Sequence, residues 1–524
     1  MQKIFPVAAI SFLILAPAAA MPPPLPDMEG KDAVTLQAEM TDGQANSDVI
    51  TAAYLDRIRR IDDSGPKLDA VIATFPDATS QAHERDRERK AGKMRGPLHG
   101  IPVLVKDNVE VAGPLATTAG SLALRGSVTG RDAPIIARLR AAGAVILGKT
   151  NLSEWANIRS DDSTSGWSAV GGLTKNPHAL DRNTCGSSSG SGAAVAASLA
   201  PLAIGTETDG SITCPAAING IVGFKPTLGL VSRTHIVPIS HSQDTAGPMA
   251  LTVRDAASLL GVMAGSDPAD PATAEADARK VDYAAALSPG ALKGKRIGVL
   301  RDRIGRRPDI AALLGDALKA MEGAGATIVD IGDSKTSLDG LGDAESEVLL
   351  TELKADMAAY LASLPGKDGP KTLADLIAFN KAHPEELRWF DQSSFEQAET
   401  KGGLDDKAYL EAKAKAARLA GPEGIDRLLA ANKVDFLVGV TNGPAWTTDL
   451  VNGDHYTGPS VSQLPAVAGY PHLTVPMGAV EGLPIGLSII GPKWSDASVL
   501  AAGYAYEQVS RKRLTPTYRP SAAP

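Results

Sequence analysis

Hydrophobic and polar residues alternate along the first half of the chain with two different periods. In residues 134–142 apolar side chains recur at helical spacing after an opening proline, and Gly143 ends the pattern, so we predict a helix there. The uninterrupted apolar run 144–147 predicts a buried strand. Small residues dominate 193–200, as in a helix packed closely against a sheet, and 201–204 leads into a further strand. This alternation favours an α/β architecture.

The pattern changes between about residues 265 and 440. This region is richer in Ala, Lys, Asp and Glu, and it contains amphipathic helical patterns such as 309–321. Three strands are nevertheless predicted within it, at 296–300, 327–329 and 435–440. The sequence has no internal repeat and no low-complexity linker, so we predict a single domain over 21–524 with a helix-rich variable region at 265–440.

The first twenty residues have the pattern of a secretory signal peptide. Lys3 precedes an apolar stretch, and small residues at 18–20 stand where a signal peptidase would cut, just before Met21. The apolar stretch is shorter than the ~20 residues that a bilayer-spanning helix needs, which argues against a membrane anchor. We therefore expect residues 1–20 to be a signal peptide and the mature chain to be exported, to the periplasm or the medium.

The composition is that of an ordinary folded enzyme, with 44% hydrophobic and 21% charged residues in a chain of 524. Acidic residues outnumber basic ones, 60 to 52, and no run of Lys and Arg is long enough to neutralise a phosphate backbone, which argues against nucleic acid as a partner. Cys185 and Cys214 are too few for a disulfide scaffold and lack metal-ligand spacing. Two buried thiols are the simpler expectation, although an exported chain could pair them.

Residues 143–150 match the spacing of a phosphate-binding P-loop. A P-loop needs a flexible turn whose backbone N–H groups surround the phosphates, whereas Ala-Val-Ile-Leu at 144–147 favours a buried strand. We therefore predict a strand at this position rather than a nucleotide site.

Residues 186–190 match the Gly-x-Ser-x-Gly nucleophile elbow, with Ser188 at its centre. The elbow requires a strand immediately before it, but residues 178–185 are polar and typical of turns. A Ser-His-Asp hydrolase would also need a histidine, and neither His241 nor His472 lies in a supporting motif. A nucleophilic Ser188 is therefore the second-ranked catalytic hypothesis.

A third constellation combines two segments. The Gly-Ser-rich stretch 186–192 precedes the small-residue helix, and 205–211 is predicted to form a turn that ends at Ser211. Pro215 favours a helix start just after this serine. Free backbone N–H groups gather at such a start and could stabilise the oxyanion of a tetrahedral intermediate. In this turn they belong to Thr208, Asp209 and Gly210, together with the serine itself.

Ordered strings covering most of the chain carry a family resemblance. They lie at 100–107, 148–157, 165–168, 186–192, 205–215, 468–471 and 482–486. In these strings the chain resembles the amidase signature family. The resemblance implies a central mixed β-sheet covered by helices on both faces. It also implies a catalytic triad of Lys106, Ser187 and Ser211, with a non-proline cis peptide before Ser187, and no metal ion or organic cofactor.

The resemblance further implies a mechanism. Ser211 attacks the amide carbon, and Ser187 passes the proton of Ser211 to Lys106. Lys106 must then be neutral, so its pKa must lie well below the usual value of about 10.4. Burial would lower this pKa, and the apolar residues 103–105 before the lysine favour burial.

Two departures from the common family pattern bear on the substrate. Many members have Gly-Gly before the nucleophile and Arg two residues after it, whereas this chain has Asp209, Gly210 and Thr213 at these positions. An acidic side chain beside the oxyanion site should disfavour anionic groups, and it could receive the leaving ammonia or a substrate N–H. The Asp-Gly-Ser form is similar to that of the subgroup that hydrolyses C-terminal peptide amides.

We therefore expect a serine amidohydrolase that releases ammonia from the C-terminal amides of short peptides. A general hydrolase of aliphatic or aryl amides is the alternative within the family. The amidotransferase subunits of the family are cytoplasmic and work with tRNA, so the signal peptide and the acidic balance argue against them. A non-catalytic periplasmic binding protein is an alternative from another class, but it would have no need of all three triad residues. The oligomeric state is left open.

Overall fold

The computed structural model describes residues 25–332, 334, 338–366, 369–456 and 458–523, together with Gln2. Apart from Gln2, the predicted signal peptide at 1–20 lies outside the described residues.

A mixed sheet of eleven strands forms the centre of the fold, in the order β1-β3-β2-β6-β8-β7-β12-β13-β11-β9-β10. Its strands are β1 Val71–Thr74, β2 Pro102–Lys106, β3 Val145–Thr150, β6 Leu202–Glu207, β7 Val222–Lys225, β8 Thr245–Ala250, β9 Arg296–Leu300, β10 Thr327–Ile331, β11 Phe436–Val440, β12 His472–Val480 and β13 Leu483–Ile490. The groups β3-β2-β6 and β11-β9-β10 are parallel, and the other neighbours are antiparallel. A small second sheet pairs β4 Trp167–Ser168 with β5 Gly172–Leu173. The predicted central mixed sheet is confirmed.

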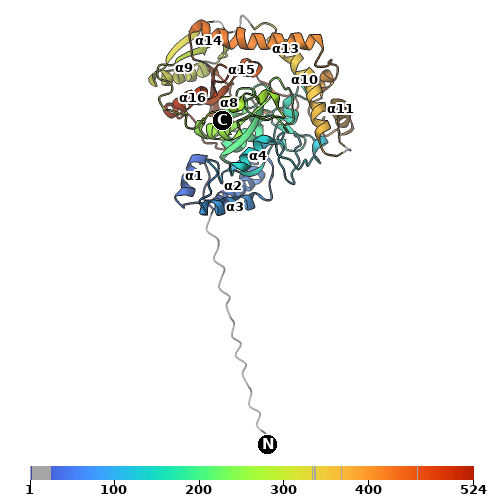
Figure 1. The fold of residues 1–524 in the computed structure, drawn as a ribbon, viewed down its shortest axis with the longest axis vertical. Coiled ribbons are helices and arrows are strands. Elements are labelled where there is room, and N and C mark those ends of the chain that lie inside the picture. Colours follow the sequence, from blue (N-terminus) through green and yellow to red (C-terminus); the bar gives the residue numbers. More distant parts are fainter. Residues whose placement is uncertain are drawn as a thin grey trace.

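Helices surround this sheet (Figure 1). They are α1 Ala33–Thr41, α2 Ser47–Arg57, α3 Ala78–Lys90, α4 Pro134–Ala141, α5 Ser189–Ala196, α6 Thr213–Ile218, α7 Val253–Met263, α8 Ala276–Arg279, α9 Pro308–Gly323, α10 Leu341–Ser363, α11 Leu373–Ala382, α12 Ser393–Glu399, α13 Lys407–Ala420, α14 Arg427–Asn432, α15 Gln463–Ala468 and α16 Asp496–Ser510. Short 3-10 or π segments are η1 Ile58–Ser64, η2 Leu122–Leu124, η3 Glu154–Asn157, η4 Pro271–Thr273, η5 Arg301–Arg303 and η6 Gly421–Asp426. In Figure 1, α1 to α3 lie at the end of the molecule opposite α13.

Most predicted elements are present with shifted ends. The helix predicted at 134–142 is α4, and the strand at 144–147 continues to Thr150 as β3. The helix predicted at 193–200 begins earlier and ends earlier, as α5, because the chain turns at Ser198, where φ is 55°. The prediction of a turn over 205–211 is wrong for 205–207, because these residues are the last three of β6 and pair with β8.

The variable region 265–440 contributes strands to the same sheet. The strands predicted at 296–300, 327–329 and 435–440 are β9, β10 and β11, and the predicted amphipathic helix is α9. The rest of the region adds helices, among which α10 and α13 pack against each other. This region therefore extends the sheet at one edge and also places helices beside it.

The parallel neighbours β2 and β6 define where a site can form. Lys106 is the last residue of β2, and β6 ends four residues before Ser211. Because parallel strands end at the same edge of a sheet, both residues are delivered to one place, where α/β folds commonly bind ligands.

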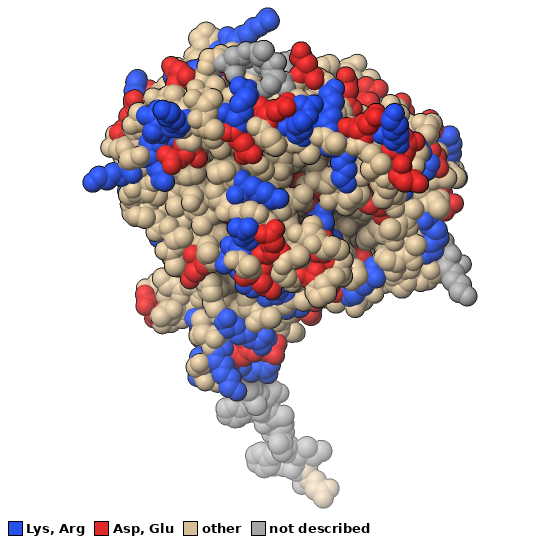
Figure 2. Space-filling view, turned by 45° about the horizontal axis from the view of Figure 1, so that its top comes forward, with Lys and Arg blue, Asp and Glu red and all other residues tan. Residues whose placement is uncertain are grey.

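No helix among the described residues is both long and apolar enough to cross a bilayer. On the face shown in Figure 2, acidic and basic side chains are interspersed, and no broad surface of a single sign is visible.

Candidate active site

Lys106 is fully buried and surrounded by oxygen atoms. Its Nζ lies 2.8 Å from Ser187 Oγ, 3.0 Å from Ser188 Oγ and 2.8 Å from Thr206 Oγ1. Burial lowers the pKa of Lys106 to about 7, against the opposing effect of nearby carboxylates. A neutral amine is therefore well populated near neutral pH, as a general base requires.

Ser187 and Ser188 differ in how their hydroxyl groups are used. Ser188 Oγ donates to the carbonyl oxygen of Thr206 at 3.0 Å and accepts the N–H of the same residue at 3.2 Å. Because a serine has one hydroxyl proton, Ser188 can only accept a hydrogen bond from Lys106. Ser187 has no such backbone acceptor among the described residues, so its hydroxyl is free to exchange a proton with Lys106.

Ser211 lies between β6 and α6 and borders a cavity of about 300 Å³, which we call the catalytic cavity. It is 9% exposed, whereas Ser187 and Ser188 have no exposed surface. The N–H of Ser188 donates to the carbonyl oxygen of Ser211 at 3.1 Å, which holds the two serine segments side by side. Of the three serines, Ser211 is thus the one that a substrate in the cavity would meet.

Asp209, Gly210 and Ser211 line the same cavity. Their backbone N–H groups have no hydrogen-bond acceptor among the described residues. The N–H groups of the two residues after Ser211 instead donate to Glu207 Oε2, at 2.8 and 2.9 Å. The three N–H groups of residues 209–211 are therefore left to bind an oxyanion. Thr208, the remaining predicted member, also lines the cavity, and its hydroxyl donates to Asp244 at 2.6 Å.

Two glycines permit this geometry. Gly210 has a φ of 76°, a left-handed conformation that favours glycine. At Gly186, which is joined to Ser187 by a cis peptide bond, a Cβ atom would lie 2.1 Å from Ser153 Oγ. A side chain at position 186 would therefore fit only if Ser153 moved.

Asp209 and Glu345 are buried carboxyl groups beside the catalytic cavity. Asp209 Oδ1 has no hydrogen-bond partner within the described part of the chain, and the residue lines the cavity. Glu345, from α10, accepts from Gln243 Nε2 and Gln463 Nε2, both at 2.9 Å. Burial raises the pKa of Asp209 well above its usual range, and the charge of Glu345 raises it further. A buried polar atom without a partner is a place where a bound molecule can supply one.

A disulfide bond joins Cys185 and Cys214, whose Cα atoms are 6.0 Å apart. The expectation of two free thiols is therefore wrong. It failed because proximity between residues 29 positions apart depends on the fold and leaves no signal in the sequence. The bond connects the segments that carry Ser187 and Ser211, and both half-cystines line the catalytic cavity.

Trp446 and Tyr456 form an aromatic wall of the catalytic cavity. Their rings meet edge to face, with centroids 5.4 Å apart. Asp454 holds the wall in place, because its Oδ1 accepts Trp446 Nε1 and its Oδ2 accepts the N–H of Ser165, each at 3.0 Å. The same two rings also line a larger cleft of about 750 Å³, bounded by segments 302–310 and 444–460, which we call the outer cleft.

A second cavity, of about 330 Å³, shares Ala156, Thr208 and Ile239 with the catalytic cavity. It is also lined by Asn108, whose Nδ2 donates to Thr206 Oγ1 at 2.9 Å. Since Thr206 Oγ1 contacts Lys106, one wall of this cavity adjoins the environment of the lysine.

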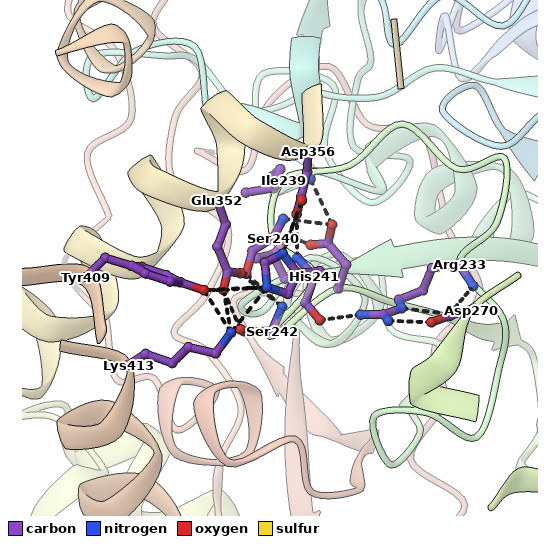
Figure 3. A network of polar contacts seen from close by, with 12 residues as sticks. Arg233, Ile239, Ser240, His241, Ser242, Asp270, Glu352, Asp356, Tyr409 and Lys413 are labelled. Carbon is purple, nitrogen blue, oxygen red and sulfur yellow. Dashed lines mark hydrogen bonds and ion pairs between the residues drawn. The ribbon is translucent and has the colours of Figure 1, made fainter. Parts of the chain in front are cut away.

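A polar network beside the second cavity fixes α10 and α13 to the segment 239–244 (Figure 3). His241 Nδ1 lies 2.9 Å from Asp356 Oδ2, and its Nε2 lies 3.0 Å from Glu352 Oε1. The hydrogen bond to Asp356 raises the pKa of His241. These three residues are near enough to hold a metal ion. However, Lys413 Nζ lies 3.1 Å from Glu352 Oε1 and supplies positive charge there, so we assign no metal to the cluster.

The residues of the P-loop-like string and of the alternative Ser-His hypothesis have other partners in the structure. Lys149, from the P-loop-like string, lies on β3, and its Nζ is 3.1 Å from Asp107 Oδ1 in a buried ion pair. His472 Nε2 contacts Ser488 Oγ at 2.6 Å. The hydroxyl of Ser188 contacts Lys106 Nζ and the backbone carbonyl of Thr206, and neither candidate histidine lies beside it.

Several contributing residues were missed by the sequence analysis. They are Thr206, Glu345, Asp454, Trp446 and Tyr456. Thr206 lies within the string 205–215 and could have been singled out there, whereas the others come from the variable region and the segment that follows it.

The chain matches known proteins in both sequence and structure. The family model described as Amidase matches residues 49–500. A probable amidase of Arabidopsis thaliana is 38% identical over 493 residues, which cover 92% of this chain and 90% of that protein. The native peptide amidase from Stenotrophomonas maltophilia is 51% identical, with a TM-score of 0.89 over 93% of this chain and 99% of that one. The peptide amidase PAM, solved with the competitive inhibitor chymostatin, is 52% identical, with a TM-score of 0.90 over the same shares.

Proposed function

Because this chain belongs to the amidase signature family and is an amidase, we propose that it hydrolyses the C-terminal amides of peptides and releases ammonia. The observation that carries the proposal is the hydrogen bond of 2.8 Å between Lys106 Nζ and Ser187 Oγ, buried beside the segment that bears Ser211. Such a pair can take a proton from a nucleophile without exposing the base to water.

The proposed reaction starts with attack of Ser211 Oγ on the carbonyl carbon of the amide. The proton of Ser211 passes to Ser187, whose own proton passes to Lys106. The backbone N–H groups of Asp209, Gly210 and Ser211 stabilise the oxyanion. When the C–N bond breaks, the proton on Lys106 returns through Ser187 to the nitrogen, and ammonia leaves an acyl-enzyme.

Water then attacks the acyl-enzyme. The relay takes a proton from the water and returns it to Ser211 Oγ as the ester bond breaks. A peptide with a free C-terminal carboxylate leaves, and Lys106 is neutral again, ready for the next cycle.

Two features of the site and one sequence similarity support a peptide amide as the substrate. The catalytic cavity adjoins the outer cleft at Trp446 and Tyr456, so room exists for a chain longer than a small amide. Asp209 Oδ1 offers an acceptor for a substrate N–H or for the departing ammonia. The peptide amidases named above share about half of the sequence of this chain.

The proposal is tested with the chain from Met21, with and without Ser211→Ala. Ammonia release is measured from an N-protected dipeptide amide, from acetamide and from an acetanilide. We expect turnover of the dipeptide amide alone, and none in the variant. Better turnover of the small amides would favour the alternative of a general aliphatic or aryl amidase. Full activity of Ser211→Ala would overturn the role of this serine, and binding without turnover would favour a binding protein.

We further propose that the protein is exported. The signal-like pattern of residues 1–20 motivates this, and a disulfide bond is typical of proteins outside the cytoplasm. Expression of the full chain in a Gram-negative host, followed by fractionation, should place a shortened protein beginning at Met21 in the periplasm or the medium. A full-length protein confined to the cytoplasm would contradict the proposal.

A further inference from the structure

The catalytic cavity and the outer cleft, which meet at Trp446 and Tyr456, are lined by different kinds of titratable residue. Of the described residues that line the catalytic cavity, the two with charged side chains, Asp209 and Asp454, are both acidic. The outer cleft is predominantly basic. Its lining includes Arg303, Arg306, Arg307 and His455, with Asp302 as its acidic residue. The carboxylate of Asp302 accepts from Ser334 Oγ at 2.7 Å.

The arginines of the outer cleft are not all engaged by carboxylates. Arg307 Nε donates to Asp309 Oδ1 at 3.1 Å, so the charge of this residue is largely neutralised. Arg303 Nε donates to Ser334 Oγ at 2.9 Å, and the nearby carboxylate of Asp302 partly offsets its charge. Arg306 is exposed and forms no ion pair with any described residue. Arg306 therefore carries a guanidinium group that can bind a further anion, with Arg303 in the same lining.

We propose that the outer cleft binds an acidic side chain of the substrate peptide, one or two residues before the residue that carries the amide. This inference rests on the proposed function. An extended peptide advances about 3.3–3.6 Å per residue, so a chain whose amide reaches Ser211 carries its preceding residues past Trp446 and Tyr456.

The different linings also fix the direction of the peptide. No cationic side chain lines the catalytic cavity among its described residues, so burying an acidic side chain or a free carboxylate there is costly and the neutral amide enters instead. Arg306 draws the acidic side chain to the outer end. The substrate class is thus a peptide amide that is neutral at its C-terminal residue and acidic just before it.

The experiment compares matched substrates. Acetyl-Glu-Leu-amide, acetyl-Gln-Leu-amide and acetyl-Lys-Leu-amide test the first position, and acetyl-Glu-Ala-Leu-amide against its Gln counterpart tests the second. In at least one series the Glu substrate should have a kcat/KM about fivefold above that of the Gln substrate, the scale of partly exposed ion pairs. The lysine substrate should be worse than the glutamine one. The preference should shrink in about 0.5 M NaCl, because salt screens exposed charges.

Arg306→Glu is the decisive variant, because an exposed and unpaired side chain can be changed without disturbing packing. It should remove or invert the ratio between the Glu and Gln substrates. Arg301→Gln is the matched control, since Arg301 precedes the same segment, pairs with Asp330 at 2.7 Å and does not line the outer cleft. The control should keep the ratio of the unaltered protein.

The possible failures are distinct. If the peptide amides are hydrolysed but Glu and Gln substrates agree within twofold in both series, the charge preference is overturned and the proposed function stands. A preference for Glu that survives Arg306→Glu and Arg303→Gln together would show that the acidic side chain binds outside the outer cleft, which would overturn the proposal. If no peptide amide is hydrolysed while small amides are, the proposed function fails and this inference falls with it.

Discussion

Lys106 Nζ lies 2.8 Å from Ser187 Oγ and 3.0 Å from Ser188 Oγ, yet only Ser187 is free to give its proton to the lysine. The hydroxyl of Ser188 is committed to the carbonyl oxygen of Thr206. Two adjacent serines at nearly equal distance from one base are therefore expected to have different roles, one in the proton relay and the other in positioning the lysine.

Alanine substitution separates these roles. Ser187→Ala should lower kcat by a factor on the order of 10⁴–10⁶, as loss of a catalytic-triad member does. Ser188→Ala should cost about tenfold, because it removes hydrogen bonds of the ordinary neutral kind to Thr206. The measurement is ammonia release from a saturating peptide amide. Equal losses in the two variants would contradict the assignment.

The activity should depend on the protonation of Lys106. Since burial lowers the pKa of this residue to about 7 and the neutral amine is the base, kcat/KM should rise with pH through this value. Lys106→Arg keeps a cation that cannot be deprotonated and should be inactive at every pH. A flat profile between pH 6 and 8 would argue against a lysine base.

The same shift should affect stability. The folded-state pKa of Lys106, about 7, lies below the unfolded-state value of about 10.5, so the unfolded chain binds more protons between these pH values. The free energy of unfolding should therefore rise with pH in this window, by up to about 1.4 kcal/mol per pH unit relative to Lys106→Met. Denaturant titrations of both proteins at several pH values provide the test.

Asp209 should be needed for recognition of the amide. Asp209→Asn has the same shape but replaces one acceptor oxygen by an NH₂ group, so kcat/KM for a dipeptide amide should fall about tenfold or more. Glu347→Gln provides a control, because Glu347 lies on α10 near Glu345 but pairs with Lys401. Unchanged kinetics in Asp209→Asn would show that the unpartnered oxygen does not contact the substrate.

The disulfide bond should contribute measurably to stability. Cys185 and Cys214 are separated by 29 positions, for which loop-closure entropy gives about 3–4 kcal/mol. The free energy of unfolding of the double variant Cys185→Ala, Cys214→Ala should be lower by that amount, so this variant should unfold at a lower denaturant concentration. The unaltered protein measured in dithiothreitol should approach the same value, and coincident curves for reduced, oxidised and variant proteins would contradict the prediction.

The sheet, which the structure confirms, and the candidate triad, whose catalytic roles stay a prediction, both have local signals. Apolar runs such as 144–147 and 297–300 favour buried strands, and the strings around Lys106, Ser187 and Ser211 are dense enough for the family to be recognised. The disulfide was not predictable, because the distance between its cysteines is set by how α6 and the segment before α5 meet. Glu345 gives no signal either, since nothing in a surface-like helical pattern shows that one carboxyl group is buried against the turn that bears Asp209.

Helix α10 faces the active site along one stripe. Glu345 lies beside Asp209, and Leu349 lines the catalytic cavity. Glu352 and Asp356 belong to the network at the second cavity, and Ala359 lines that cavity. The proposed relay comes from the sheet and its adjoining turns, so α10 shapes the space around Ser211 without supplying a residue of the proton path. A change on this stripe can therefore alter which molecules reach Ser211 while leaving that path intact. This separation makes α10 a natural target for redirecting the enzyme.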